Sequence, residues 1–264
     1  MTTKRKHLVI PDCQVKDGVP LDHLEWIGKY IVDKKPDVII NLGDFADMPS
    51  LSSYDKGTKS FEGRRYKKDV EVTKAAMNKL LRPMRQYNER ARRNKEKQYR
   101  PEMILTLGNH EHRINRAVES DPKLDGTISV EDLCYEQNGW KVYDFLEPVV
   151  VDGVVYCHYL VSGVMGRPIT TTAQMVNKIH QSAVVGHQQG RQISFGRRAD
   201  GSEFTCIIAG SAYLHNEDYM GHQGNKHWRG IVMLHEVNDG YFDESMISLN
   251  FLKEKYGSEE VQEA

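Results

Sequence analysis

Five short apolar segments, each followed by polar residues of types that bind metal ions, constrain the fold of this chain most strongly. The segments are His7–Ile10, Val38–Leu42, Met103–Leu107, Val154–Cys157 and Ala183–Val185. Their length and their content of β-branched residues predict buried β-strands. The polar residues beyond the strands include Asp12, Asp44, Asn109, His158 and His187. One Asp or His after a strand is usually a turn or structural residue. Five such strand ends instead predict one shared cleft, because ligands collect where parallel strands end.

Helical spacing of apolar residues separates the strands of the first half. A helix is predicted over Leu21–Asp33 and another over 70–91, where apolar residues recur every three or four positions. Pro83 lies inside the second of these segments and is expected to kink or split it, because proline lacks the amide N–H that a helix needs. Ser129 is a predicted N-cap, with an acidic residue at the capping-box position, for a helix ending at Gly139.

Asp-Gly pairs mark turns in the second half. Asp152-Gly153, Asp200-Gly201 and Asp239-Gly240 each stand between strand-like segments. Asp-Gly favours the type I′ hairpin turn, because both central residues of that turn need a positive φ. We therefore expect antiparallel hairpins here, and for the whole chain an α/β (α+β) fold, a mixed β-sandwich flanked by helices. The chain is interpreted as a single domain over residues 1–252, followed by an acidic tail over 253–264.

Composition excludes several classes of protein. The chain has 264 residues, 39% hydrophobic and 28% charged, which allows a large core and argues against disorder. No apolar stretch approaches the roughly 20 residues that a membrane-spanning helix needs. The apolar segment near the N-terminus is too short for a signal peptide. The four cysteines include no Cys-x-x-Cys pair, which argues against a zinc ribbon or a disulfide scaffold. We therefore expect a protein of a reducing, cytoplasmic compartment with no membrane partner.

Charge is distributed unevenly along the chain. Residues 56–100 contain 16 Lys or Arg and 5 Asp or Glu, a net charge of +11 in a chain whose total is −1. Such a basic segment indicates either contact with a polyanion or a solvated helical face.

Taken in order, five motifs resemble those of the calcineurin-like metallophosphoesterases. They are Asp12-x-Gln14, Gly43-Asp44-x-x-Asp47, Gly108-Asn109-His110-Glu111, His158 and Gly186-His187-x-Gln189. Their residue patterns are similar to those of phage-encoded members of that superfamily. The resemblance implies a four-layer architecture and hydrolysis of phosphate esters, with phosphodiesters preferred. For a phage-encoded protein, the compartment would be the host cytoplasm.

The resemblance also implies a set of metal ligands. Asp44 would bridge two divalent ions, Asp12 would hold the first, and the second would be completed by Asn109, His158 and His187. A set of carboxylate, carboxamide and imidazole ligands suits Mn²⁺ best, with Fe, Zn²⁺, Mg²⁺ or Ni²⁺ as alternatives. Two such ions clamp a phosphate and activate a water during in-line displacement.

Two of the family's usual histidines are replaced in this sequence. Gln14 and Gln189 stand where the family usually has His, and both of those His belong to the first ion. A Gln oxygen is neutral and harder than imidazole, so it still binds Mn²⁺ or Mg²⁺. The first site is therefore expected to be weaker or tuned to a harder cation; the alternative is loss of that ion and of most activity.

Two residues are implied to act beside the metals. His110, oriented by Asp47, would serve as general acid or transition-state stabiliser at the scissile phosphate. Arg113 could clamp the substrate phosphate with two hydrogen bonds, or equally form a surface salt bridge. Weaker candidates lie between two C-terminal strands, where a loop could reach the cleft: His215, His222 and His227.

Residues from about 48 to 102 are predicted to form a basic helical insertion between the second and third motifs. Because this segment leaves and returns at the rim of the cleft, it could form a lid or a basic wall that binds nucleic acid through residues 56–100. The alternative is an element for dimerisation or solubility.

Three functions remain open: a metal-dependent phosphoesterase acting on phosphate esters, a nuclease acting on DNA or RNA, and a catalytically weak, metal-bound binding protein. The sequence does not specify the oligomeric state.

Overall fold

Two mixed β-sheets form the centre of the molecule. The computed structural model describes residues 4–53, 57, 61–217 and 220–257. One sheet has the strand order β11-β10-β1-β2-β3-β4 and the other has the order β5-β6-β7-β9-β8. The first comprises β1 (Arg5–Ile10), β2 (Val38–Asn41), β3 (Glu102–Thr106), β4 (Lys141–Tyr143), β10 (Gly230–Asn238) and β11 (Tyr241–Ser248). The second comprises β5 (Val149–Val151), β6 (Val154–Cys157), β7 (Ala183–Val185), β8 (Arg191–Arg197) and β9 (Glu203–Ala209).

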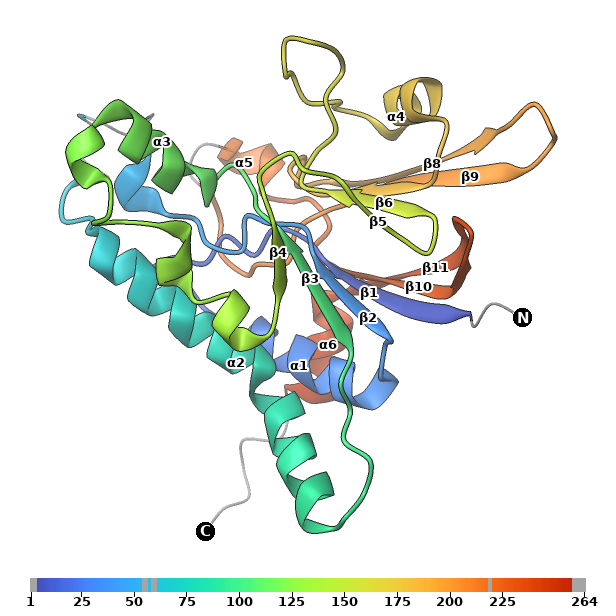
Figure 1. Cartoon of the computed structure of the whole chain (residues 1–264), viewed down its shortest axis with the longest axis horizontal. Helices are drawn as coiled ribbons and strands as arrows, with labels where there is room; N and C mark the ends of the chain where they lie inside the picture. Colours follow the sequence, from blue (N-terminus) through green and yellow to red (C-terminus); the bar gives the residue numbers. More distant parts are fainter. Residues whose placement is uncertain (1–3, 54–56, 58–60, 218–219, 258–264) are drawn as a thin grey trace.

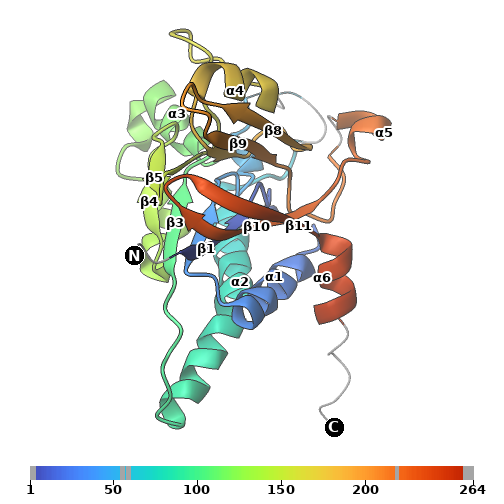
Figure 2. The same ribbon diagram turned by 90° about the vertical axis from the view of Figure 1, so that its right-hand side faces the viewer.

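Helices lie on the outer faces of the two sheets, as Figures 1 and 2 show. The first sheet is covered by α1 (Asp22–Lys34), α2 (Tyr66–Arg93) and α6 (Leu249–Tyr256), and the second by α4 (Thr172–Ile179). The remaining helical segments are α3 (His112–Ser120), α5 (Gly221–Gly224) and the 3₁₀ turns η1 (Pro49–Leu51), η3 (Pro122–Leu124), η4 (Val130–Leu133) and η5 (Glu136–Asn138). The expected α/β sandwich flanked by helices is therefore confirmed, with four layers.

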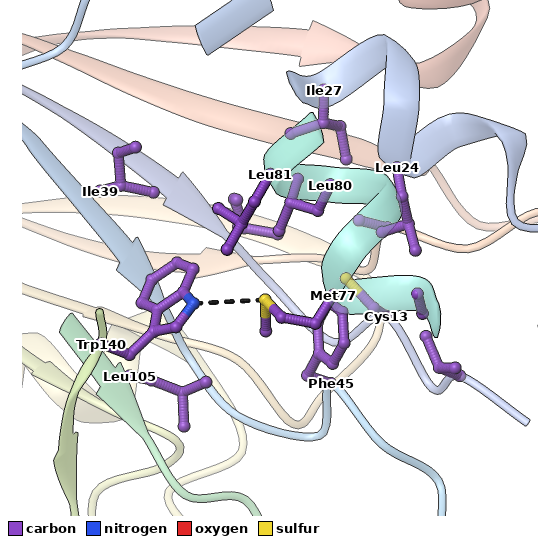
Figure 3. Packing of buried hydrophobic residues seen from close by; sticks show 14 of the residues in the cluster. Cys13, Leu24, Ile27, Ile39, Phe45, Met77, Leu80, Leu81, Leu105 and Trp140 are labelled. Atoms are coloured by element: carbon purple, nitrogen blue, oxygen red, sulfur yellow. Dashed lines mark hydrogen bonds between the residues drawn. The ribbon is translucent and has the colours of Figure 1, made fainter. Parts of the chain in front are cut away.

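Each gap between layers holds its own hydrophobic cluster. Successive residues of a strand point to opposite faces of a sheet, so Leu8 packs toward the helices while its neighbour Val9 packs toward the second sheet. Val155 of β6 faces α4 in the same way. Figure 3 shows the cluster beneath α1 and α2, where the Trp140 indole N–H donates to the Met77 sulfur at 3.2 Å.

The predicted strands and the first helix are confirmed, whereas three local predictions need correction. α2 continues through Pro83 as one helix, so of the kink or split expected there the split does not occur. The helix expected between Ser129 and Gly139 is replaced by the two short turns η4 and η5, although the Asp132 carboxylate does accept from the Ser129 N–H at 2.9 Å. Within the second half, β6, β7 and β9 pair in parallel, so this half is not made of antiparallel hairpins alone.

All three Asp-Gly pairs join antiparallel strands, but by two kinds of turn. At Asp152-Gly153 and Asp239-Gly240 both residues have positive φ, as a type I′ turn requires. At the β8–β9 connection only Gly201 has a positive φ, and the Arg198 N–H donates to the Ser202 carbonyl across a longer loop. The β10–β11 hairpin joins the first sheet beside β1, where it completes that sheet on one side.

The predicted basic insertion and acidic tail both contribute to the core. α2 buries Val70, Met77 and Leu80 in the cluster beneath the first sheet. The start of the expected tail completes α6, whose Lys255 bonds to Asp33 at 2.9 Å; residues 258–264 lie outside the described residues. The four cysteines carry free thiols, and Cys157 is buried. No helix among the described residues is long and apolar enough to cross a membrane.

Gly28 sets the distance between α1 and α2. A Cβ at this position would lie 2.3 Å from the Leu80 carbonyl oxygen and 2.9 Å from Cγ of Pro83. Replacing a helical glycine by alanine normally stabilises a protein by about 1 kcal/mol. We expect Gly28→Ala to lower the free energy of unfolding by about 1–3 kcal/mol instead, because the added methyl group overpacks the helix interface. Urea unfolding measures the difference, and an unchanged or higher stability would contradict this packing.

Candidate functional site

The loops that follow five strands meet between the two sheets. β1, β2 and β3 are parallel neighbours in the first sheet, and β6 and β7 are parallel neighbours in the second. The backbone N–H groups of Cys13 and Gln14 both donate to the Asp44 carbonyl, which ties the first two loops together. A cavity of about 930 Å³ opens over these loops. Its walls include Gln14, Asp44, Asp47, Asn109, His110, Arg113, His187 and Gln189.

One group of ligand atoms converges around Asp44. Its carboxylate and one nitrogen each of His158 and His187 lie within 4.8 Å of one another, an arrangement that can hold a metal ion. The Nε2 atom of His158 lies 3.3 Å from Asp44 Oδ2 and 2.9 Å from Asn109 Oδ1. Nδ1 of the same ring lies 2.8 Å from the Leu42 carbonyl oxygen, an acceptor, so Nδ1 carries the proton. Nε2 is therefore the atom that would bind a cation, which would displace the second proton that the ring holds without metal, and Nδ1–H would orient the ring as in most metal-binding histidines.

Burial and charge act in opposite directions on these groups. Burial lowers the pKa of His158, but the neighbouring Asp44 carboxylate outweighs it and raises that pKa to about 9. Burial, together with the nearby His158, lowers the pKa of His187 to about 4, so His187 is neutral at neutral pH. Asp44 is buried as well, yet His110 and His158 hold its pKa below the usual range. The site therefore keeps an ionised carboxylate among imidazoles in a dry environment.

A second group of oxygen atoms gathers around Asp12. Its Oδ1 atom accepts from the His187 backbone N–H at 3.0 Å, and its Oδ2 atom accepts from Nε2 of Gln189 at 2.7 Å. Burial raises the pKa of Asp12 to about 7, although the nearby His158 opposes this shift. Oε1 of Gln14 and Oε1 of Gln189 are buried and have no hydrogen-bond partner among the residues that the structure describes. Buried polar atoms almost always have partners, so these two unpaired carboxamide oxygens of residues that line the cavity fit a hard divalent cation.

His110, Asp47 and Arg113 form a connected set beside the first group. Nδ1 of His110 lies 2.8 Å from Asp47 Oδ1, and Nε2 of His110 lies 3.1 Å from a guanidinium nitrogen of Arg113. The other terminal nitrogen of Arg113 donates to the Asp47 carbonyl oxygen at 2.7 Å. Burial lowers the pKa of His110, but Asp44 and Asp47 together raise it above its usual value. Arg113 also forms an ion pair with Asp47 Oδ1 at 3.3 Å, so the salt bridge considered as an alternative is present, but it lies in the cavity wall and not on the surface.

Glu111 holds the loops in place, a role that the sequence did not assign to it. Its carboxylate is fully buried and accepts from the backbone N–H groups of Asp44, Ala46 and Gly108 at 2.9–3.0 Å. The Tyr135 hydroxyl donates to the same carboxylate at 3.2 Å. Because these donors come from the loops after β2 and β3, one side chain fixes both loops relative to each other.

Four residues of these loops have a strained backbone. Gln14, Asp44, His187 and Gln189 all have φ between 43° and 67°, the left-handed region that non-glycine residues rarely occupy. Such strain persists only where the surrounding structure enforces it, and it clusters at functional sites. Gly108 shows how closely the loops approach, because a Cβ there would lie 2.1 Å from Asp44 Oδ1.

The structure brings together all ten sequence-predicted site residues, while the weaker histidine candidates lie at different distances from the cavity. His215 contacts Glu217, which lines the cavity, with its Nε2 2.6 Å from the Glu217 carboxylate. His227 instead bonds to the Ser211 hydroxyl. The side chain of His222 lies outside the described part of the structure. Lys16 and Glu217 also line the cavity, and nothing in their sequence context distinguished them.

No family model matches this chain. The Gene 54 protein of Mycobacterium phage L5 is 36% identical over 85 residues, which are 31% of this chain and 31% of that protein. The match therefore spans about a third of the phage protein. Among solved structures, YfcE, a phosphoesterase from E. coli, aligns over 92% of this chain and all of its own, at 12% identity and a TM-score of 0.36. The protein TT1561 of Thermus thermophilus aligns over 92% of this chain and 99% of its own, at 8% identity and a TM-score of 0.37.

Proposed function

We propose that this protein is a metal-dependent phosphoesterase of the calcineurin-like type that prefers phosphodiesters. The observation that carries this proposal is the cluster of Asp44, His158 and His187 directly beside the His110–Asp47 pair. The cluster supplies ligands for a cation, and the pair supplies a hydrogen-bonded imidazole at the same cavity wall. The loops that carry the cluster and the pair follow one another along the chain in the same order as the motifs from which these residues were predicted.

The residues present fit two divalent ions. We propose Mn²⁺ because carboxylate, carboxamide and imidazole ligands suit it. One ion would be held by Asp44, Asn109, His158 and His187, and the other by Asp44, Asp12, Gln14 and Gln189. When bound, the ions would neutralise phosphoryl oxygens and lower the pKa of a coordinated water. The second set has only neutral amide oxygens beside its carboxylates, so we expect it to bind more weakly.

His110 is the group placed to handle a proton at the reacting phosphate. Asp47 Oδ1 lies 2.8 Å from its Nδ1 and forms an ion pair with the ring, which leaves Nε2 at the cavity wall beside Arg113. In the structure Nε2 accepts from Arg113. In the proposed reaction that guanidinium N–H turns to a phosphoryl oxygen and Nε2 takes up a proton from solvent. Nε2–H then donates this proton to the departing ester oxygen, while Asp47 stabilises the positive ring. The Arg113 guanidinium lies beside that atom and can hold a phosphoryl oxygen next to it.

The size of the cavity supports a diester. A phosphodiester carries two substituents, and a volume of about 930 Å³ leaves room for both. The outer wall of the cavity includes Arg64, Arg65 and Lys68 at the start of α2. These basic side chains share the cavity lining with the acidic residues Asp17, Glu62 and Asp69. They favour a second candidate function, a nuclease that binds a nucleic-acid backbone there.

Only one end of the basic segment reaches the cavity. Arg90, Arg92 and Arg93, which the sequence assigned to the same basic wall, belong to the last turn of α2. At 1.5 Å per helical residue they lie roughly 35 Å from Lys68. Any nucleic-acid contact at the site is therefore expected to depend on the first turn of the helix and not on the last.

Hydrolysis of bis(p-nitrophenyl) phosphate in Mn²⁺ tests the main proposal. We expect turnover by the wild-type protein and a loss of about 10²-fold or more in His110→Ala, because the proton donor is removed. His180→Asn, on the exposed surface after α4, is the matched control and should keep full activity. Wild-type protein that is folded and metal-bound yet inactive would contradict the proposal, as would full activity in His110→Ala.

Two matched charge reversals test the nuclease function. Arg65→Glu/Lys68→Glu and Arg92→Glu/Arg93→Glu change the net charge equally, and all four side chains are exposed. We expect the first pair to weaken binding and degradation of single-stranded DNA or RNA about tenfold or more at low salt, and the second pair to have little effect. Equal effects of the two pairs would indicate unspecific attraction and would exclude a specific wall at the cavity.

A further inference from the structure

Lys16 occupies the centre of a chain of charged groups that ends at His110. Its ammonium nitrogen lies 3.0 Å from Asp47 Oδ2, and 2.6 Å and 2.7 Å from the two carboxylate oxygens of Glu217. The other Asp47 oxygen, Oδ1, lies 2.8 Å from His110 Nδ1. His215 closes the far end at Glu217. Carboxylates therefore alternate with the Lys16 ammonium and two imidazole rings across the cavity wall.

The backbone fixes this arrangement from both sides. Val15 N–H donates to the Phe45 carbonyl, and Asp47 N–H donates to the Val15 carbonyl, so the loops after β1 and β2 continue the parallel pairing of their strands. This pairing places Lys16 beside Asp47. On the other side, the Glu217 N–H and C=O both bond to the side chain of Asn225 at 2.8 Å.

The ammonium group of Lys16 is saturated by these contacts. A lysine has three N–H donors, and three carboxylate oxygens of Asp47 and Glu217 lie within 3.0 Å of its nitrogen. Its side chain is 20% exposed, whereas those of Asp47 and Glu217 are 10% and 7% exposed. Lys16 lines the cavity, but its donors are used inside the protein, which argues against a primary role in holding substrate phosphate.

Removing the ammonium would leave two buried carboxylates facing each other. Like charges repel strongly where solvent is excluded. Among the ion pairs of the described residues, Asp47 would keep only His110 and Arg113 as partners, and Glu217 would keep only His215. Asp47 could relieve that repulsion by rotating or by taking up a proton, and either change would weaken its bond to His110. The Glu217 charge is therefore harmful to the His110–Asp47 pair unless Lys16 lies between them.

We propose that Lys16 and Glu217 are positioning residues that hold Asp47 in the orientation that fixes the His110 ring. This inference rests on the proposed function only in so far as His110 acts on the substrate. Lys16 binds one Asp47 oxygen, Oδ2, and leaves Oδ1 for His110 and for Arg113, whose nitrogen lies 3.3 Å from it. Glu217 holds Lys16 in place and links the loop after β9 to the site.

Rescue by a second substitution tests this arrangement. We expect Lys16→Met to lower kcat on bis(p-nitrophenyl) phosphate about tenfold or more while KM changes little, because misplacement of one reacting group commonly costs that much. Lys16→Met/Glu217→Gln should recover most of the loss, because it also removes the repelling charge. Glu217→Gln alone should cost less than Lys16→Met. A raised KM without rescue in the double variant would show that Lys16 contacts substrate and would overturn the proposal.

The His110 ring reports on the same arrangement without catalysis. In ¹H–¹⁵N spectra recorded in Mg²⁺, with the ring signals assigned by their loss in His110→Asn, we expect Lys16→Met to shift or broaden the Nδ1 signal. The double variant should restore it. An unchanged Nδ1 signal in folded Lys16→Met would overturn the positioning role. If the wild-type protein hydrolyses no ester, the proposed function fails and this spectrum still decides the role of Lys16.

An exposed ion pair elsewhere provides the matched control. Lys4 and Glu236 lie 2.5 Å apart on the surface, with side chains that are 59% and 60% exposed. Lys4→Met and Lys4→Met/Glu236→Gln make the same chemical changes outside the cavity. Both should leave kcat and the His110 signal unchanged, whereas a loss equal to that of Lys16→Met would assign the effect to net charge.

Discussion

The burial of the Asp44 carboxylate is the constraint on which the site depends. The residue is 1% exposed, and an isolated carboxylate in such a position would cost several kcal/mol. Compensation comes from the His110 backbone N–H at 2.8 Å and from the His158 ring at 3.3 Å. These partners belong to the loops after β3 and β6, so the charge can be accommodated only when both sheets are assembled. Site and fold therefore form together.

Glu111 and Asp12 extend this dependence to the neighbouring loops. Glu111 accepts three backbone N–H groups from the loops after β2 and β3, and this fixes Asp44 in its strained left-handed conformation. Asp12 accepts the His187 N–H and so ties the end of β1 to the end of β7. Three buried acids, Asp12, Asp44 and Glu111, follow neighbouring strands of the first sheet and converge on one small region. Such an excess of carboxylate suits bound cations, as do the unpaired buried carboxamide oxygens of Gln14 and Gln189.

The sequence predicted those parts of the molecule that depend on local pattern. The strands that lead to Asp44 and His187 can be recognised in the sequence because hydrophobic segments and the polar residues that follow them are local features. Long-range contacts could not be predicted from the sequence. Nothing near Tyr241 indicates that its hairpin pairs with β1. Nothing near Pro83 indicates that α2, which packs against α1, stays continuous there. Glu111 was part of a recognised motif, but its three backbone partners appear only after folding. Lys16 resembled any other lysine until Asp47 and Glu217 surrounded it.

Anomalous diffraction from crystals grown in Mn²⁺ tests the central claim most directly, namely that two cations share Asp44. The account predicts two manganese peaks about 3.5–4 Å apart on either side of that carboxylate. One should lie against His158 and His187, and the other against Asp12 with the carbonyl oxygens of Gln14 and Gln189 turned toward it. A single peak beside His158, with both Gln side chains turned away, would contradict the two-ion site, and no peak at Asp44 would contradict the account as a whole.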